Sequence, residues 1–487
     1  MQIQFIGRKY ELQRLNDVFK MGQACVTTIT GRRRIGKSRL IQEFSQGKRF
    51  LSFTGLAPIE GITAQSQRDA FAMQLADFMK TQPKTYTDWT AAFNDLASHL
   101  TKEPTVILLD EISWMASDDH TFVPKLKNLW DLKLQQKSNL MLVFCGSVST
   151  WIEKNIIRST AFFGRITLHL DLEPLSIAES ALFLRTMGFK ASLYDICTIL
   201  AIMGGVPWYL EKISRQYTTS QNIKNLCFEP RGLLVKEFDS IFHDLFNGHG
   251  STYKRIVYLL ADGMKDSDEI KQALDLADVA MLETCMHDLV TAGFVSKHAP
   301  WSFTTGKAKE KESLYRLCDN YLRFYIKYIE PRMSTINQKK YRELSVQSLP
   351  GWDAMMGFQL ETLLLNNRPT LLKALGLDAT EIIADNPYIQ RGAHGERGCQ
   401  IDYLIQTRTK TLFVCEFKFV RRELGMGIIR SMREKIKSFS VPHGYGIVPV
   451  LFHFEGVTPE LDLDPYFYRM IDITKFLKPE TEHESWE

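Results

Sequence analysis

The distribution of apolar residues indicates buried strands near the start of the chain, separated by amphipathic helices. Short, largely apolar runs occur at positions 26–29, 106–109 and 140–145. Strands that are apolar without alternation are typical of a parallel sheet covered by helices on both faces. Helical spacing appears between them, as at 12–19, where the apolar residues fall on one face. The pattern predicts an α/β core.

The first apolar run leads into the sequence GRRRIGKS at positions 31–38, and a helical pattern follows at 39–44. A bound phosphate needs several N–H donors and a cation, which a glycine-rich loop, a helix N-terminus and a lysine supply. Lys37 is expected at the β- and γ-phosphates, and the Ser38 hydroxyl at Mg²⁺. The sequence therefore predicts a nucleoside-triphosphate site, with ATP and Mg²⁺ as cofactors.

The second apolar run ends in Asp110 and Glu111. Doubly wound sheets bind ligands at the carboxyl ends of their strands. Asp110 is predicted to hold Mg²⁺ through water, and Glu111 to polarise the attacking water. The alternative is a strand that happens to end in two acids. The third run ends at Gly146 and Ser147, and Ser147 is a candidate sensor of the γ-phosphate.

Two later segments carry further candidates for nucleotide contact. Arg165, in the sequence FFGR, is a candidate for the γ-phosphate of its own subunit or of a neighbour, and a plain surface arginine is the alternative. The sequence GGVP at 204–207 ends one helical pattern and begins another, because glycine ends helices and proline suits a first turn.

Taken in order, the segments 5–11, 31–38, 108–111, 146–147 and 204–207 resemble the archaeal-type ATPases, a branch of the STAND group within the AAA-like P-loop enzymes. The resemblance covers about the first 240 residues. It implies an ATP-binding core, a helical lid, a winged-helix domain and slow hydrolysis used as a switch. The candidate nucleotide-binding residues are Gly31, Arg34, Gly36, Lys37, Ser38, Arg39, Asp110, Ser147, Arg165 and Pro207.

The middle of the chain predicts a winged helix. Helical patterns at 256–260, at 268–274 with Ser267 as its cap, and at 279–292 precede a strand at 294–296 and a wing near 299–300. The third helix carries acids and no Lys or Arg, whereas phosphate contacts dominate DNA affinity. We interpret the domain as a spacer or regulatory module. Residues 314–329 are expected to form an aromatic helix leading into the last domain.

Alternating segments at 399–406 and 411–419 predict a β-hairpin. A three-residue turn at 408–410 pairs 401 with 417, 403 with 415 and 405 with 413, which makes a wholly apolar face. The same register places Asp402 opposite Glu416, with Lys418 two residues further on. Two adjacent carboxylates repel each other unless a cation lies between them, and a hard ion such as Mg²⁺ suits oxygen ligands.

These residues resemble the motif of the PD-(D/E)XK nuclease superfamily, over roughly 351–437. Asp402 matches the first acid, Glu416 and Lys418 match the E-x-K, and Glu361 matches a helical glutamate, while Ile401 replaces the proline of the family's name. The resemblance implies that Asp402, Glu416 and Lys418 are catalytic and that Glu361, Asp402 and Glu416 bind Mg²⁺ or Mn²⁺. A strand with an exposed Glu/Lys pair and an inert nuclease fold are the alternatives.

The following helix has an apolar stripe (Ile429, Met432 and Ile436) and a basic face (Arg430, Arg433 and Lys437). This face suits a DNA backbone, and an ordinary solvated helix is equally compatible. With a net charge of only +4, any nucleic-acid surface must be local.

The composition is that of ordinary globular material, with 45% hydrophobic and 24% charged residues among 487. The eight scattered cysteines suggest reduced thiols in a cytoplasmic protein, and no signal peptide, membrane span or membrane partner is expected. The predicted fold is multidomain α/β: a P-loop parallel-sheet ATPase core (1–170), a helical lid (171–248), a winged helix (249–320) and a C-terminal α/β nuclease-like domain (321–487).

The predicted function is an ATP switch coupled to a nuclease that acts on DNA, with a homo-oligomer or a regulatory protein as further partners. Genome defence is one setting that fits. The alternative is an ATP-driven regulatory scaffold with an inert C-terminal domain.

Overall fold

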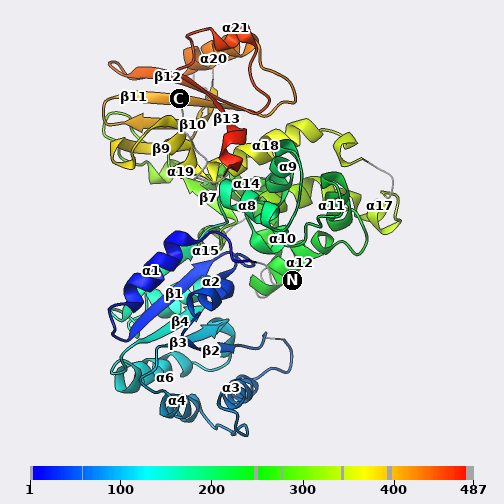
Figure 1. Ribbon diagram of the computed structural model, residues 1–487. Helices are drawn as coiled ribbons and strands as arrows, with labels where there is room; N and C mark the ends of the chain where they lie inside the picture. The colour runs from blue at the N-terminus through cyan, green and yellow to red at the C-terminus, as the bar shows by residue number, and fades with distance from the viewer. Residues whose placement is uncertain are drawn as a thin grey trace. The chain divides into compact units, whose positions relative to one another are not determined.

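The computed structural model describes residues 4–57, 59–147, 149–245, 250–275, 278–341, 345–391 and 398–478. The chain forms two compact units (Figure 1). The first contains residues 1–174 with 291–293, and the second contains residues 175–290 and 294–487.

The first unit is built on a five-stranded sheet in which all neighbouring strands run parallel. The strand order is β2-β3-β4-β1-β5. The three apolar runs of the sequence are β1, β3 and β4, and they lie side by side in the middle of the sheet. The strands are β1 (Cys25–Gly31), β2 (Arg49–Thr54), β3 (Thr105–Asp110), β4 (Leu140–Cys145) and β5 (Ile166–Leu172).

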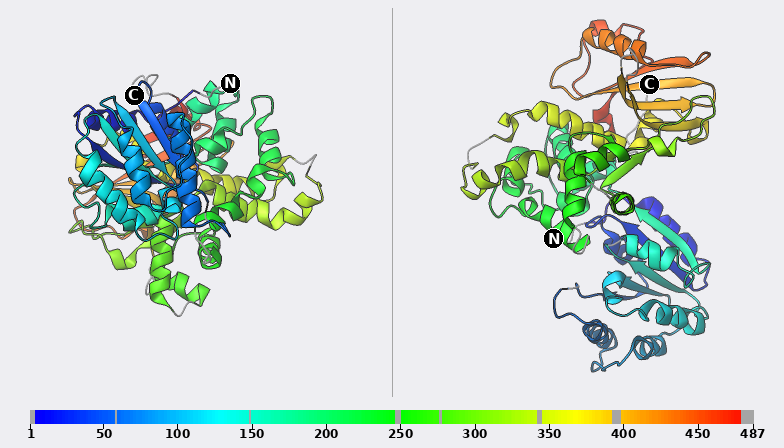
Figure 2. Two further views of the ribbon diagram at one scale, coloured as in Figure 1. Left: turned by 90° about the horizontal axis from the view of Figure 1, so that it is seen from below. Right: turned by 180° about the vertical axis from the view of Figure 1, so that it is seen from behind.

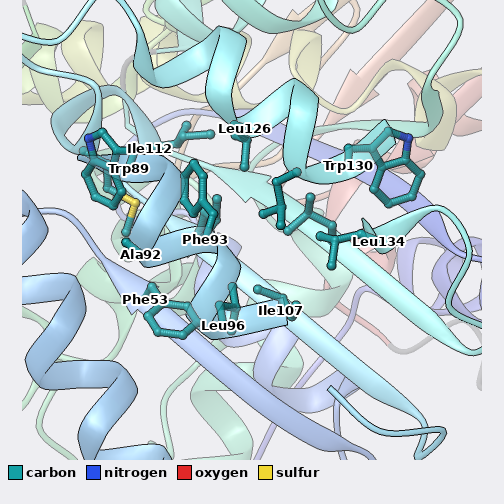
Figure 3. Close-up of a cluster of buried hydrophobic side chains, with 14 of the residues drawn as sticks. Phe53, Trp89, Ala92, Phe93, Leu96, Ile107, Ile112, Leu126, Trp130 and Leu134 are labelled. Atoms are coloured by element: carbon teal, nitrogen blue, oxygen red, sulfur yellow. The ribbon is translucent and has the colours of Figure 1, made fainter. Parts of the chain in front are cut away.

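Helices cover both faces of this sheet, which explains why its central strands are apolar throughout. One face packs against α1 (Lys9–Phe19) and α2 (Lys37–Phe44). The other packs against α3 (Ala64–Met79), α4 (Trp89–Ser98) and α6 (Phe122–Leu129). Figure 3 shows side chains of this second core, including Trp89 and Phe93, whose rings stack at 5.3 Å. Two short helices, α5 (Ile112–Met115) and α7 (Ser149–Ile152), follow β3 and β4.

The second unit begins with helices and a small antiparallel sheet of order β6-β8-β7. Its strands are β6 (Lys265–Asp266), β7 (Val295–His298) and β8 (Leu314–Leu317). The helices are α8 (Ile177–Thr186), α9 (Leu193–Met203), α10 (Pro207–Leu210), α11 (Thr219–Cys227), α12 (Glu237–Leu245), α13 (Gly250–Leu260), α14 (Ser267–Leu274) and α15 (Val279–Thr291). These include the three helices and the hairpin of the predicted winged helix, and the identity of that domain stays a prediction.

Two sequence predictions in this region are wrong. Asp266, not Ser267, is the N-cap of α14, and its carboxylate accepts a hydrogen bond from the Glu269 N–H at 2.8 Å. Residues 314–317 form strand β8 instead of the start of an aromatic helix. The helix begins only at α16 (Asn320–Phe324), which Asp319 caps, and it continues as a π-helical turn over Tyr325–Ile329.

The predicted helix punctuation at 204–207 is confirmed. Helix α9 ends at Met203, Gly204 has a φ of 60°, and Pro207 opens α10. Gly205 packs directly on the backbone of Leu175, whose N–H donates to the Gly205 carbonyl at 2.8 Å. A Cβ at Gly205 would lie 1.9 Å from the Leu175 carbonyl oxygen, so this position requires glycine.

The C-terminal part of the second unit is a mixed sheet of order β13-β12-β11-β10-β9. The pairs β9/β10 and β10/β11 are antiparallel, and β11/β12 and β12/β13 are parallel. Figure 2 shows this sheet from behind, with α20 packed against it. The strands are β9 (Ile382–Gln390), β10 (Cys399–Thr407), β11 (Thr411–Lys418), β12 (Gly446–His453) and β13 (Arg469–Asp472). The helices are α17 (Met333–Asn337), α18 (Trp352–Leu365), α19 (Arg368–Leu375), α20 (Gly427–Ser438) and α21 (Pro459–Asp462).

All eight cysteines are unpaired, as predicted. In the part of the chain that the structure describes, no helix combines the length and apolar character of a membrane span.

Candidate functional sites

The loop at 31–38 connects the carboxyl end of β1 to the N-terminus of α2. Gly31 has a φ of 126°, and a Cβ there would lie 2.4 Å from the Leu172 carbonyl oxygen on the neighbouring strand. Arg34 and Gly36 also have positive φ values, of 68° and 92°, and Gly36 is the N-cap of α2. These turns wrap the backbone in front of the helix N-terminus, which is the geometry of a phosphate-binding loop.

Polar side chains of this loop are held in place by hydrogen bonds. The Lys37 ammonium is buried and donates to the carbonyl oxygens of Gly31 at 2.8 Å and Arg32 at 3.0 Å. The Ser38 hydroxyl donates to the Asp110 carboxylate at 2.5 Å. The sequence predicted Ser38 and Asp110 as partners of one Mg²⁺ ion, and the fold brings them into direct contact.

Glu111 lies immediately beyond β3, in a left-handed backbone conformation with a φ of 49°. Its carboxylate accepts hydrogen bonds from both the N–H and the hydroxyl of Ser147, each at 2.8 Å. Burial raises the pKa of Glu111, while these two hydrogen bonds act in the opposite direction. Ser147 therefore holds the candidate base here, and its predicted contact to a γ-phosphate stays a prediction.

Two residues that the sequence did not single out as site residues support the loop. The Arg8 guanidinium is buried and donates to the carbonyl oxygens of Ile35 at 3.3 Å and Glu173 at 2.6 Å. The Ser149 hydroxyl accepts a hydrogen bond from the Gly31 N–H at 3.1 Å. Arg8 belongs to the segment 5–11 already recognised in the sequence, whereas no sequence signal identified Ser149.

Arg165 does not reach the nucleotide site of its own subunit, so that part of its prediction is wrong. It directly precedes β5, whose first residue pairs with Val26 near the start of β1, whereas the phosphate loop follows the end of β1 at Gly31. At roughly 3.3 Å per strand residue, the start and the end of β1 are about 20 Å apart. Arg165 instead makes a bidentate ion pair with Asp131, at 2.7 and 2.9 Å, and this pair lowers the pKa of Asp131 to about 2. Contact with a neighbouring subunit stays a prediction.

We therefore expect Arg165→Ala to leave ATP affinity within about twofold of the wild type, because the side chain lies at the opposite edge of the sheet. Equilibrium titration with a fluorescent ATP analogue measures this, with Lys37→Ala as the variant that loses binding. A tenfold weaker affinity in Arg165→Ala would contradict the placement.

The remaining predicted nucleotide contacts lie in different places. Arg39 is half-buried on α2 and donates to Gln42 at 3.0 Å. Pro207 belongs to the second unit. Their contacts with nucleotide stay predictions.

The second candidate site lies where β10 and β11 separate. The predicted register is confirmed at the pairs Tyr403/Cys415 and Ile405/Phe413. The ladder ends there, and the Asp402 carboxylate accepts a hydrogen bond from the Phe417 N–H at 2.9 Å. Asp402 thus lies beside Glu416 as predicted, but it binds the facing strand through its side chain.

A β-bulge aims Asp402. On the other side of β10, Ile401 pairs with Tyr388 and Leu404 with Asn386, so Asp402 and Tyr403 face the single residue Pro387. Proline has no N–H to donate, and a bulge absorbs the missing ladder bond. Beyond the bulge, the side chains of β10 that would have faced one side of the sheet face the other.

The predicted apolar face is therefore wrong in part. Ile401 packs with Leu404, Leu412 and Val414 in the core beneath α20, and Tyr403 does not belong to that core. Both faces of the hairpin are buried.

Two lysines converge on Glu416, whose side chain is only 5% exposed. The Lys418 ammonium, from two residues further along β11, lies 2.6 Å from Glu416 Oε1. The Lys435 ammonium, from α20, forms an ion pair with Glu416 Oε2 and lies 3.8 Å from Asp402 Oδ1. Lys435 was not among the site residues predicted from the sequence.

Glu361 is the third acid of the cluster. It lies on α18 and lines one cavity of about 710 Å³ together with Asp402, Glu416, Lys418 and Lys435. Within the described residues, its carboxylate has no hydrogen bond or ion pair. Burial raises the pKa of Glu361, and the buried Arg316 and Arg323 act in the opposite direction.

The electrostatics of the cluster centre on Asp402. Burial raises the pKa of Asp402 to about 7, and the charges of Glu416 and Glu361 act in the same direction. Lys435 and the Phe417 N–H oppose this shift. Asp402 is therefore poised to exchange a proton for a cation near neutral pH.

The donor set suits a hard divalent ion, since three acidic side chains line one cavity and Glu361 has no partner among the described residues. The present arrangement is not a ready-made ion site. Among the residues the structure describes, no three His, Cys, Asp or Glu side chains are grouped closely enough to hold an ion as they stand.

The first unit, with its parallel sheet, phosphate loop and pair of acids after β3, defines a P-loop ATPase core. Residues 5–213 match the family model described as an ATPase domain predominantly from Archaea. Residues 5–213 are therefore similar to ATPase domains of this archaeal type. The match ends well before β9, the first strand of the C-terminal sheet.

The chain is also similar to individual proteins. An uncharacterized protein of Methanocaldococcus jannaschii, MJECL04, is 25% identical over 340 residues, which are 69% of this chain and 71% of that protein. The Walker-type ATPase PABY2304 of Pyrococcus abyssi has the same fold with a TM-score of 0.52 and 16% identity, over 66% of this chain and 96% of that one. The ORC2 protein of Aeropyrum pernix gives a TM-score of 0.44 and 12% identity, over 68% and 94% of the two chains, which is too distant to add to the argument.

Proposed function

We propose that the protein is an ATP-dependent switch coupled to a divalent-metal-dependent phosphodiesterase that acts on DNA. The phosphodiesterase activity is supported by one observation above all. Four residues converge in one cavity: Asp402, Glu416, Lys418 and Glu361. Glu361 comes from α18, outside the β10/β11 hairpin that carries the other three residues, so its meeting with them does not follow from local sequence.

At the ATPase site, each residue has a role that follows from its position. Lys37 would bind the β- and γ-phosphates, and Ser38 and Asp110 would hold Mg²⁺. Glu111 would orient and polarise the attacking water once Ser147 releases it. The domain would then hydrolyse ATP slowly and report its nucleotide state to the rest of the chain, through the predicted helical lid (171–248) and winged helix (249–320).

At the second site, Asp402, Glu416 and Glu361 would hold Mg²⁺ or Mn²⁺. A bound divalent ion supplies Lewis acidity and lowers the pKa of a bound water. Lys418, which pairs with Glu416, would orient the water or offset charge on the phosphate. The water oxygen would attack phosphorus as the bond to the leaving sugar oxygen breaks, and the proton that the water loses would balance the one that this sugar oxygen gains.

The surroundings of the cavity support a nucleic-acid substrate. Arg430, Arg433 and Lys437 line an adjoining cavity of about 380 Å³, and Glu434 is common to both cavities. Within the described residues, Arg430 and Lys437 have no carboxylate partner, so their charges are available to phosphates. Phe358, 56% exposed, lines the first cavity and offers a ring on which a base can stack.

The test is cleavage of plasmid DNA by the full chain in Mg²⁺ or Mn²⁺, with and without ATP. We expect metal-dependent nicking that Glu416→Gln reduces by about 100-fold or more, because the substitution removes a charged ligand and one partner of both lysines. Glu423→Gln is the matched control, because Glu423 is an exposed glutamate five residues after Lys418. Equal cleavage by wild type and Glu416→Gln contradicts the proposal, and cleavage of RNA alone contradicts the choice of DNA.

A second candidate function is a regulatory scaffold that uses ATP and has a catalytically inert C-terminal domain. It is favoured by the position of Lys435, whose ammonium pairs with Glu416 near Asp402, where a cation would otherwise be needed. Retained ATP hydrolysis, with neither metal binding nor cleavage at the second site, would select this function. Oligomerisation or a regulatory protein partner is compatible with both functions.

A further inference from the structure

Lys435 occupies a position on α20 where the helical spacing calls for an apolar residue. Ile428, Ile429 and Met432 form the buried face of this amphipathic helix. Lys435 follows Ile428 by seven residues and Met432 by three, so it projects from the same face. Its side chain is only 19% exposed. A lysine placed toward the interior is rare unless its charge is paired.

The charge of Lys435 is paired by the two acids of the candidate nuclease site. Its ammonium forms an ion pair with Glu416 Oε2 and lies 3.8 Å from Asp402 Oδ1. Burial lowers the pKa of Lys435, but Asp402 and Glu416 raise it above its ordinary value, so the side chain is charged. Lys418 contacts the other oxygen of Glu416, at 2.6 Å, and leaves this position to Lys435.

We propose that Lys435 is a built-in counter-ion, which holds the cation position beside Asp402 and Glu416 and gives it up when a divalent ion binds. This inference rests on the proposed nuclease function and adds a positioning residue to it. The displaced ammonium stays within the same cavity, whose α20 side is lined by Ser431, Glu434 and Ser438. The four-carbon stem of lysine is flexible enough for this movement.

The net charge of the cavity indicates a role for the displaced lysine in binding substrate. Asp402, Glu416 and Glu361, when ionised, outnumber Lys418 and Lys435 by one negative charge. A divalent ion reverses this to one positive charge, which matches the single negative charge of a phosphodiester. Lys435 would then bind a phosphate oxygen, so that metal and substrate binding support each other.

The inference is tested by metal binding, with no nucleic acid present. Isothermal titration of the full, nucleotide-free chain with Mn²⁺ is compared for the wild type and Lys435→Met, which keeps the apolar stem and removes the charge. We expect Lys435→Met to bind Mn²⁺ at least about tenfold more tightly, because a like charge near the ion is gone. Lys475→Met, at an exposed position of the same unit, should equal the wild type. Asp402→Ala, expected to lose binding, identifies the titrated site.

Lys435→Arg keeps the charge and should retain the weak binding of the wild type, which separates loss of charge from altered folding. Cleavage should also fall in Lys435→Met although its metal site is better filled. Equal Mn²⁺ affinity in the wild type and Lys435→Met overturns the inference and leaves the nuclease proposal standing. Absence of binding in both proteins overturns the inference and the nuclease proposal together. Binding by Lys435→Met alone supports the inference most directly.

Discussion

Replacing Lys37 with alanine is expected to abolish ATP binding, and with it hydrolysis. Lys37 is 7% exposed, and the carbonyl oxygens of Gly31 and Arg32 hold its ammonium at the centre of the phosphate loop. A charged hydrogen bond to a phosphate oxygen contributes about 1.5–3 kcal/mol, so losing contacts to two phosphates weakens affinity by about 100-fold or more. Titration with a fluorescent ATP analogue, together with phosphate release, measures both quantities. Lys102→Ala, an exposed lysine of the same unit, is the matched control.

Glu111→Gln separates binding from chemistry at the same site. The amide keeps the size of the side chain and can still bond to Ser147, but it cannot accept the proton of the attacking water. We expect ATP affinity near that of the wild type and hydrolysis slower by about 10²–10⁴-fold. Hydrolysis at the normal rate would show that Glu111 is not the base.

Replacing Asp402 with asparagine is expected to remove metal-dependent cleavage and also to stabilise the folded protein above pH 7. The folded-state pKa of Asp402 is raised to about 7 by burial, whereas an unfolded aspartate titrates near 3.9. Between these values the folded state holds a proton that the unfolded state has released. The free energy of unfolding therefore falls as pH rises from about 4 to about 7, and the loss is complete above that range.

Asparagine does not ionise, so Asp402→Asn should lack this loss and exceed the wild type at pH 8 by on the order of 1–3 kcal/mol. Near pH 4 the two proteins should be similar. Thermal and denaturant unfolding at pH 5 and pH 8, in the presence of a chelator, test the sign, with the exposed Asp462→Asn as control. A variant that is less stable than the wild type at pH 8 would mean that the Asp402 charge stabilises the fold. Lys435 keeps its contact with Glu416 in this variant, so no unpaired cation is created.

Several elements could be predicted because their determinants are close together in the chain. The phosphate loop lies between one strand and one helix, and its positive φ values fall at Gly31, Arg34 and Gly36. The register of the β10/β11 hairpin follows from its three-residue turn, so the proximity of Asp402 and Glu416 was predictable as well.

The errors have different physical causes. A short run such as Leu314–Leu317 is compatible with a strand or a helix. It forms a strand because it pairs with β6 and β7. Arg165 could have been placed correctly, since a residue that precedes a parallel strand lies at the edge opposite the nucleotide.

By itself, the sequence determined that this protein has an ATPase core and that two acids and a lysine meet on one hairpin, because spacing along the chain sets both. Only the tertiary structure decided how those acids are used. The bulge that aims Asp402 depends on Pro387 of the neighbouring strand, and the cation beside it comes from Lys435, on a helix that follows both strands. Contacts of this kind depend on how a helix is rotated and where a sheet is interrupted, and the packing of distant segments sets both.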